Sequence, residues 1–137
     1  MKKIALISCG SLKVNKKSKV KNLYIGDLFK KSLNYCLQNY DEVYVLSAKY
    51  GLLHLEEEIE PYNVSLHSKT IRERKEWAYK VYKQIEEKIG LNNKFYLYTG
   101  KLYREYLLRV LNSEAPLSKL TNNGLGYQKK FYKDNTK

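Results

Sequence analysis

Three short apolar runs of this 137-residue chain are each followed by small or hydroxyl-bearing residues and a glycine. The runs are residues 4–7, 43–46 and 95–98. Glycine lets a ligand approach the backbone, hydroxyl and amide groups donate hydrogen bonds, and lysine supplies positive charge. A phosphate or a nucleobase needs these groups at close range. They are Ser8, Cys9 and Gly10 after the first run, Ser47, Ala48, Lys49, Tyr50 and Gly51 after the second, and Thr99, Gly100 and Lys101 after the third.

The spacing of apolar residues predicts the elements that position these groups. The three apolar runs read as buried strands, and residues 26–40, 71–89 and 102–111 have helical spacing. Residues 11–22 and 52–68 are polar or irregular and predict loops. We therefore expect an α/β fold, a single three-layer Rossmann-like domain over residues 1–137 with a small, mostly parallel sheet flanked by helices. The tail from about residue 127 is expected to be irregular, with at most a short element at 127–132.

Right-handed crossovers place all three strand ends at one edge of such a sheet. Ligands of open α/β sheets bind outside the carboxyl ends of the strands, so we expect a pocket where the three ends meet. The alternative is that each glycine merely turns the chain after its strand. The chain has no Walker A, GxGxxG or GxSxG motif, which disfavours an ordinary ATPase, a dinucleotide enzyme and an α/β-hydrolase.

Further candidate contacts come from the surrounding sequence. Lys13 and Lys49 are expected to contact an anion, and tyrosines near the predicted edge can stack on a base. Glu60 is the candidate catalytic carboxylate, because it precedes Pro61 and could act as a base or stabilise an oxocarbenium ion at a sugar–base bond. The alternative for Glu60 is an ordinary solvated residue. The tyrosines are Tyr24, Tyr50, Tyr62 and Tyr103.

The two cysteines, Cys9 and Cys36, indicate a reducing compartment, and we expect a cytoplasmic protein. Cys9 is either a nucleophile at a strand end or a small packing residue, and neither His54 nor His67 is placed as its base by the sequence. Cys36 lies on an apolar helix face and is expected in the core. Neither a metal site nor a cofactor is predicted, and no run is long enough to span a bilayer.

The charge of the chain is strongly positive. Lysine and arginine number 26 against 14 acidic residues, for a net charge of +12. Such a field attracts nucleotides and nucleic acids, although it also serves solubility alone. The expected partners are therefore a nucleotide, a nucleobase or a nucleic acid, and not a membrane.

Three groups of residues resemble one family. The opening group has the form SCGKxK … A-x-x-LY … LF, the central group SAKYGLL … IEPY, and the closing group AGxxY … PL … GLGIG. Together these are similar to the small bacterial and phage proteins known as YaaA-like, or "peroxide stress", proteins. The matching residues are Ser8 to Gly10, Lys13, Leu23 and Tyr24, Leu28 and Phe29, then Ser47 to Leu53 and Ile59 to Tyr62, and last Thr99, Gly100, Tyr103, Pro116, Leu117 and Gly124 to Gly126.

This resemblance implies a compact α/β fold linked to nucleotide or nucleic-acid biology. A similar central motif in proteins of deazaguanine modification points to nucleobase chemistry. The chain departs from the pattern at Ser11, Val20, His54 and Asn63, the last of which stands where an aspartate is common. We therefore expect either an enzyme acting on a nucleoside or its glycosidic bond, or a non-catalytic binder of a small (cyclic) nucleotide or of DNA. A purely structural domain would leave the strand-end pattern unexplained.

Overall fold

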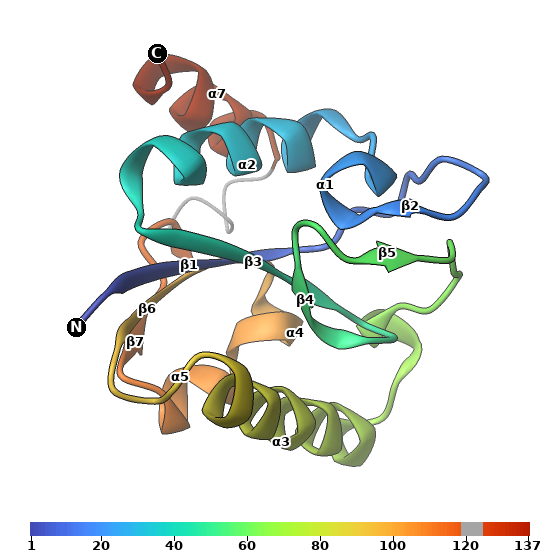
Figure 1. The fold of residues 1–137 in the computed structure, drawn as a ribbon, viewed down its shortest axis with the longest axis vertical. Coiled ribbons are helices and arrows are strands. Elements are labelled where there is room, and N and C mark those ends of the chain that lie inside the picture. Colours follow the sequence, from blue (N-terminus) through green and yellow to red (C-terminus); the bar gives the residue numbers. More distant parts are fainter. Residues whose placement is uncertain (119–124) are drawn as a thin grey trace.

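The fold is mixed α/β, as expected, with helices packed on a five-stranded and mostly parallel sheet (Figure 1). A computed structural model describes residues 1–118 and 125–137. Its strands are β1 (Lys3–Ser8), β2 (Ser18–Lys19), β3 (Glu42–Ser47), β4 (Gly51–His54), β5 (Glu58–Ile59), β6 (Lys94–Tyr98) and β7 (Ser113–Glu114). Its helices are α1 (Val20–Leu23), α2 (Asp27–Asn39), α3 (Ile71–Lys88), α4 (Lys101–Arg104), α5 (Leu107–Val110) and α7 (Leu125–Asn135), with a 3-10 turn at Leu66–Ser68.

The sheet has the strand order β4-β3-β1-β6-β7, and β1 pairs in parallel with both β3 and β6. The three predicted strands therefore end at one edge of the sheet, as expected. Only β4 runs antiparallel, as a hairpin partner of β3. A separate two-stranded ribbon joins β2 to β5.

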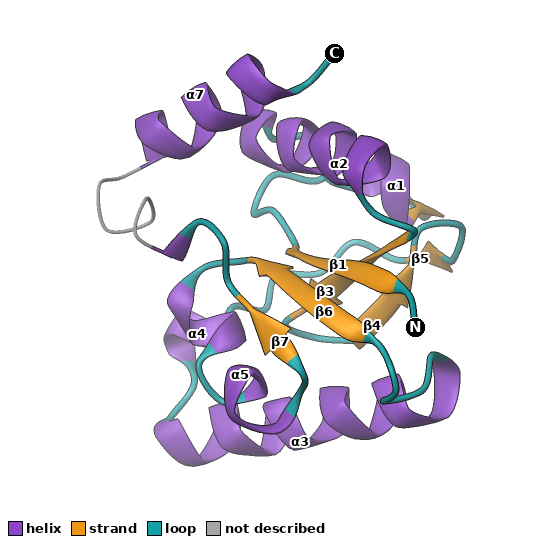
Figure 2. Cartoon of the chain, turned by 90° about the vertical axis from the view of Figure 1, so that its left-hand side faces the viewer, coloured by secondary structure: helices purple, strands orange, loops and turns teal. Residues whose placement is uncertain are grey.

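Alternate residues of β1 enter two different cores, because successive side chains of a strand point to opposite faces. Ala5 and Ile7 pack with α1, α2 and the buried Tyr132 of α7, whereas Ile4 and Leu6 pack with α3 and α5. Figure 2 shows α2 and α7 on one side of the sheet and α3, α4 and α5 on the other. All four side chains are fully buried, so β1 is the central strand of the molecule.

Helix α3 begins with a capping box. The Thr70 hydroxyl accepts from the backbone N–H of Glu73, and the Glu73 carboxylate accepts from the backbone N–H of Thr70. Trp77, Val81 and Ile85 lie on its buried face. The helix predicted from the spacing of residues 71–89 is therefore confirmed as α3.

Several segments differ from the sequence-based expectation. Residues 52–68 contain β4, β5 and a 3-10 turn, residues 11–22 include β2 and the start of α1, and the helix expected at 102–111 is divided into α4 and α5. The expected irregular tail is helical over Leu125–Asn135, because Phe131 and Tyr132 pack on the ring of Tyr35 in α2. Gly124 of the closing motif lies outside the described residues. No helix in the described part of the chain is long and apolar enough to cross a membrane.

Candidate functional site

The chain leaves the neighbouring strands β1 and β6 in opposite directions. From β1 it reaches β3 through α2 on one face, and from β6 it reaches β7 through α4 and α5 on the other (Figure 2). In open α/β sheets such a divergence opens a crevice outside the carboxyl ends of the two strands. A cavity of about 680 Å³ lies at this point and is lined by both strand ends.

The cavity gathers half of the predicted ligand contacts. Beside them it holds Lys101, which follows the third strand run in the sequence. Glycines and hydroxyl groups here alternate with apolar side chains, so the lining offers both hydrogen-bond donors and contact surface. The predicted residues that line the cavity are Ser8, Cys9, Gly10, Lys13, Thr99, Gly100 and Tyr103.

The end of β3 does not line this cavity. Ser47 pairs with Gly51 across a tight hairpin, so the chain turns straight back into β4. The turn packs on α3, because Trp77 Nε1 donates to the Ser47 carbonyl at 2.9 Å and Lys80 Nζ donates to the Lys49 carbonyl at 3.2 Å. The predicted contacts that this end contributes lie outside the cavity, namely Ser47, Ala48, Lys49, Tyr50 and Gly51.

Gly51 has a conformational role in this hairpin. Its φ of +77° is one that residues with a side chain rarely adopt. Gln84 of α3 closes over it, donating to the Tyr50 carbonyl at 3.1 Å and accepting from the Leu52 N–H at 2.7 Å. At the end of β3, therefore, the glycine turns the chain, which is the alternative to a ligand contact.

Glu60, the predicted catalytic carboxylate, is exposed and does not line the cavity. Its backbone carbonyl lies 3.5 Å from the hydroxyl of Tyr50. A carboxylate that acts on a sugar–base bond must reach the bound ligand. The structure therefore places Glu60 outside the cavity, beside Tyr50 of the β3–β4 turn and not among the residues that line the cavity.

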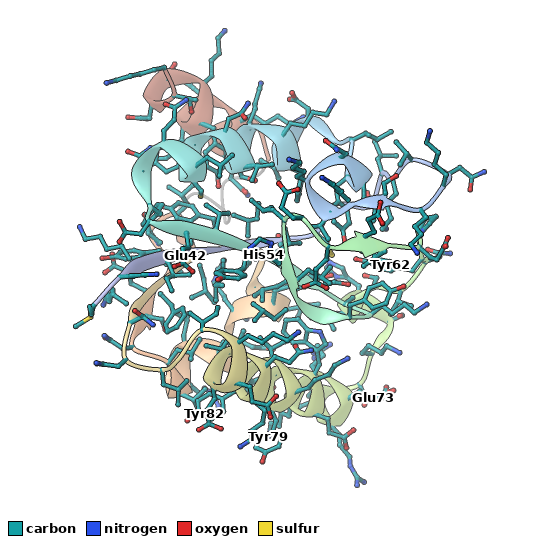
Figure 3. All side chains as sticks on the ribbon, viewed as in Figure 1. Glu42, His54, Tyr62, Glu73, Tyr79 and Tyr82 are labelled. Carbon is teal, nitrogen blue, oxygen red and sulfur yellow. The ribbon has the colours of Figure 1, made fainter. Side chains whose placement is uncertain are left out.

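Tyr24 and Tyr62 are likewise not among the residues that line the cavity. Their hydroxyls are 2.6 Å apart, and Ser47 Oγ donates to the Tyr62 hydroxyl at 2.8 Å. Figure 3 shows Tyr62 beside β5, at the end of the sheet away from the N-terminus. Burial raises the pKa of both tyrosines well above the usual range.

Cys9 lies in the cavity with its thiol half-buried. Its sulfur is 3.7 Å from the hydroxyl of Tyr103, whose ring packs edge-on against Trp77. His67 lines the same cavity, although the sequence alone did not place it. Cys36 is fully buried on α2 and belongs to the core, as expected.

Sequence reasoning missed the parts of the lining that come from other segments. Asp27 at the start of α2, Asn63 and His67 before α3, and Lys129 of α7 all reach the cavity. Two of these residues have a sequence feature that could have indicated them. Asp27 is an acidic residue at the start of a predicted helix, and Asn63 is a departure from the YaaA-like pattern. Nothing in the local pattern around Lys129 connects it with strand ends far away in the sequence.

The charge of the lining is positive. Asp27 is the only carboxylate among the described lining residues, and it pairs with Lys31 at 3.2 Å and Lys129 at 3.5 Å. The hydrogen bond from Lys31 lowers the pKa of Asp27. Lys13 and Lys101 make no ion pair within the described part of the chain. An anion entering the cavity therefore meets two lysines that no carboxylate neutralises.

Fold and site together define a small α/β protein with a cationic cavity at a strand switch point. The chain belongs to DUF6884, a family of unknown function, whose profile it matches over residues 4–134. No curated protein and no solved structure matches it. Among the described residues no group of three or more His, Cys, Asp or Glu side chains is placed to hold a metal ion.

Proposed function

We propose that this protein binds a nucleotide, or a related small molecule bearing a nucleobase, in the cavity at the ends of β1 and β6. The single observation that carries the proposal is the cavity itself, which lies where the connections of two adjacent parallel strands diverge. That is the place where Rossmann-like three-layer folds hold their nucleotides, and we assign this fold to the same architecture.

The chemistry of the lining supports this ligand class. Gly10 and Gly100 allow close approach to the backbone, and Ser8 offers a hydroxyl group, whereas the Thr99 hydroxyl donates to the Gly100 carbonyl at 3.0 Å and can only accept from a ligand. Leu12, Leu28 and Phe29 offer apolar surface for a base or sugar, as small-molecule sites generally do. The resemblance to YaaA-like proteins stays a prediction, and so do the nucleotide-linked and cytoplasmic roles that it implies.

Binding is a better proposal than cleavage of a glycosidic bond. Glu60 lies outside the cavity, and Asp27, the carboxylate that lines it, is held by two lysines. A general acid or base needs a carboxyl group free to exchange a proton with the substrate. The Asn63 departure points the same way, since an amide carries no such proton.

A thermal-shift panel tests the proposal. Purified protein is heated with nucleobases, nucleosides, nucleotides, cyclic nucleotides and short DNA, each at low and moderate salt. A ligand at about 100 times its Kd should stabilise the fold by about 2.7 kcal/mol. We expect a shift with one class of small molecule that persists at moderate salt.

Gly100→Val serves as the blocking variant in this panel. Gly100 lines the cavity, and a Cβ added there meets no heavy atom within 4 Å, so the first atom of a new side chain enters open space. We expect it to abolish the ligand-induced shift while leaving the melting temperature of the free protein nearly unchanged. Lys88→Met, on the exposed face of α3, is the matched control and should keep the shift. A shift unchanged by Gly100→Val would place the ligand elsewhere and contradict the proposal.

Binding of nucleic acid through the basic surface is the second candidate. Lys16 and Lys17 are exposed and make no ion pair among the described residues, and the whole chain carries +12. Lys19 and Lys21, in contrast, share Glu56 at 3.1 and 2.6 Å. Such binding should weaken steeply with salt, because each neutralised phosphate releases counterions. A shift with DNA alone, lost at moderate salt, would favour this candidate over the cavity.

A further inference from the structure

The cationic side chain Lys13 has an unusual setting at the edge of the cavity. Its ammonium lies 4.4 Å from the ring centre of Tyr62 and 5.8 Å from that of Tyr24. A cation over an aromatic face is attracted by the ring quadrupole and keeps its charge. The lysine is therefore held in place by groups that do not neutralise it.

The backbone of Lys13 is fixed as well. Lys13 and Tyr24 form an isolated antiparallel bridge, and the Val14 N–H donates to the Leu23 carbonyl at 2.9 Å. On the other side the Ile25 N–H donates to the Leu12 carbonyl at 3.0 Å. These bonds join the loop after β1 to the segment that leads into α2. They fix the backbone on both sides of Lys13 and thereby the direction of its side chain.

Tyr62 is anchored from the end of β3. Ser47 Oγ donates to its hydroxyl and itself accepts from the backbone N–H groups of Lys49 at 3.2 Å and Tyr50 at 3.0 Å. On the other side the Tyr62 hydroxyl meets that of Tyr24, which is only 1% exposed. The Tyr62 ring that contacts Lys13 is thus fixed by hydrogen bonds from its hydroxyl to Tyr24 and Ser47. Ser47 belongs to the hairpin that packs on α3.

We propose that Lys13 binds the phosphate group of a nucleotide in the cavity and that Tyr62 is the positioning residue that holds Lys13 there. The inference rests on the proposed function and narrows it to phosphate-bearing ligands. It also gives the end of β3 a role, since Ser47 acts on the cavity through Tyr62 although it does not line it. A bare nucleobase would bring no negative charge to Lys13, which among the described residues of the free protein meets only the two rings and the Ser11 carbonyl at 3.4 Å.

The positioning part is measured on the ligand-free protein. Ring currents of Tyr62 and Tyr24 should shift the NMR signals of the Lys13 ε-methylene group upfield, with assignment by the Lys13→Arg variant. Tyr62→Leu removes the ring and should move these signals towards those of a free lysine, whereas Tyr62→Phe keeps the ring and should retain most of the shift. An unshifted Lys13 signal in the natural protein, or one unaffected by Tyr62→Leu, would overturn the inference.

The ligand part is measured by calorimetry with AMP and GMP beside adenosine and guanosine. Lys13→Met should weaken binding of the preferred monophosphate about tenfold or more, as expected for a lost hydrogen bond to a charged group. Binding of the matching nucleoside should stay within a factor of two. Tyr62→Leu should also weaken binding of the monophosphate, by less than Lys13→Met does. Tyr62→Phe should weaken it less than Tyr62→Leu. Lys88→Met removes the same charge far from the cavity and should change neither affinity.

The outcomes separate the two proposals. Selective loss of monophosphate binding in Lys13→Met and Tyr62→Leu supports both. Equal binding of nucleoside and monophosphate by all variants overturns the inference and leaves the proposed function standing. Absence of binding of every nucleoside and nucleotide by the natural protein overturns both, even where the Lys13 signals show the expected ring-current shift.

Discussion

The guanidinium group of Arg104 donates a hydrogen bond of 2.7 Å to the backbone carbonyl of Thr99. Arg104 belongs to α4 and is only 8% exposed, and burial lowers its pKa. Thr99 follows β6 and lines the cavity beside Gly100. A buried cation thus holds the strand end that forms one wall of the candidate site.

Arg104→Met tests this relationship. Methionine fills much of the same space but leaves the Thr99 carbonyl without this donor, and an unsatisfied buried acceptor costs about 1–3 kcal/mol. We expect a loss of that size in the free energy of unfolding, measured with urea. Arg72→Met is the control, since the Arg72 side chain is 90% exposed and should change stability by less than about 0.5 kcal/mol. Equal losses in the two variants would contradict the structural role of Arg104.

Gly51→Ala should destabilise the protein by about 1–3 kcal/mol, as expected for a side chain forced to a positive φ. The new Cβ would also stand 2.3 Å from Gln84 Oε1, so Gln84 must give up its position. Gly26→Ala is the matched control, because its φ is −67° and its Cβ would meet nothing within 4 Å. That variant should lose less than about 1 kcal/mol. Urea unfolding of both variants decides the point, and a neutral Gly51→Ala would show that the hairpin is wrongly described.

The two cysteines should differ in reactivity. Cys9 faces the cavity and is half-buried, whereas Cys36 is fully buried and burial strongly raises the pKa of its thiol. Since the thiolate is the reactive form, a small thiol reagent should modify Cys9 in the native protein and Cys36 only after unfolding. Mass spectrometry after a timed reaction identifies the modified residue, with Cys9→Ser as the control. Equal rates of modification at Cys9 and Cys36 in the native protein would contradict the placement of Cys9 in the cavity and of Cys36 in the core.

The protein should lose stability at alkaline pH. Burial raises the pKa of Tyr98 and Tyr132 above the ordinary value of 10.0, and burial likewise raises the pKa of Tyr40 to about 12. A group with a raised folded-state pKa contributes stability that is complete below its unfolded pKa and is lost as the pH rises further. The loss should therefore begin near pH 10, at about 1.4 kcal/mol per pH unit for each such group.

Urea unfolding across this pH range measures the slope. Tyr98→Phe removes one of the buried hydroxyls and should make the decline shallower, although it also removes the hydrogen bond to Tyr40. Tyr79→Phe is the control, because Tyr79 is 66% exposed and projects from α3 away from the sheet (Figure 3). A decline as steep in Tyr98→Phe as in the natural protein would show that this hydroxyl ionises normally.

Much of the fold was accessible from local patterns. The three apolar runs became β1, β3 and β6, and the helical spacing located α2 and α3 to within a few residues. Strand β4 was missed because Leu52 and Leu53 lie side by side and show no alternation, so only pairing with β3 identifies them as a strand. The helical tail was missed because its stability comes from Phe131 and Tyr132 packing on distant α2.

The candidate site divides in the same way. The sequence by itself determined that the ends of β1 and β6 carry glycine, hydroxyl groups and lysine, since strand periodicity and residue type are local properties. Only the tertiary structure decided that the end of β3 closes into a hairpin, that Glu60 lies outside the cavity, and that Asp27, His67 and Lys129 line it. The physical reason is that these placements depend on strand order and on packing between segments far apart in the chain. No local pattern of residues encodes such distances.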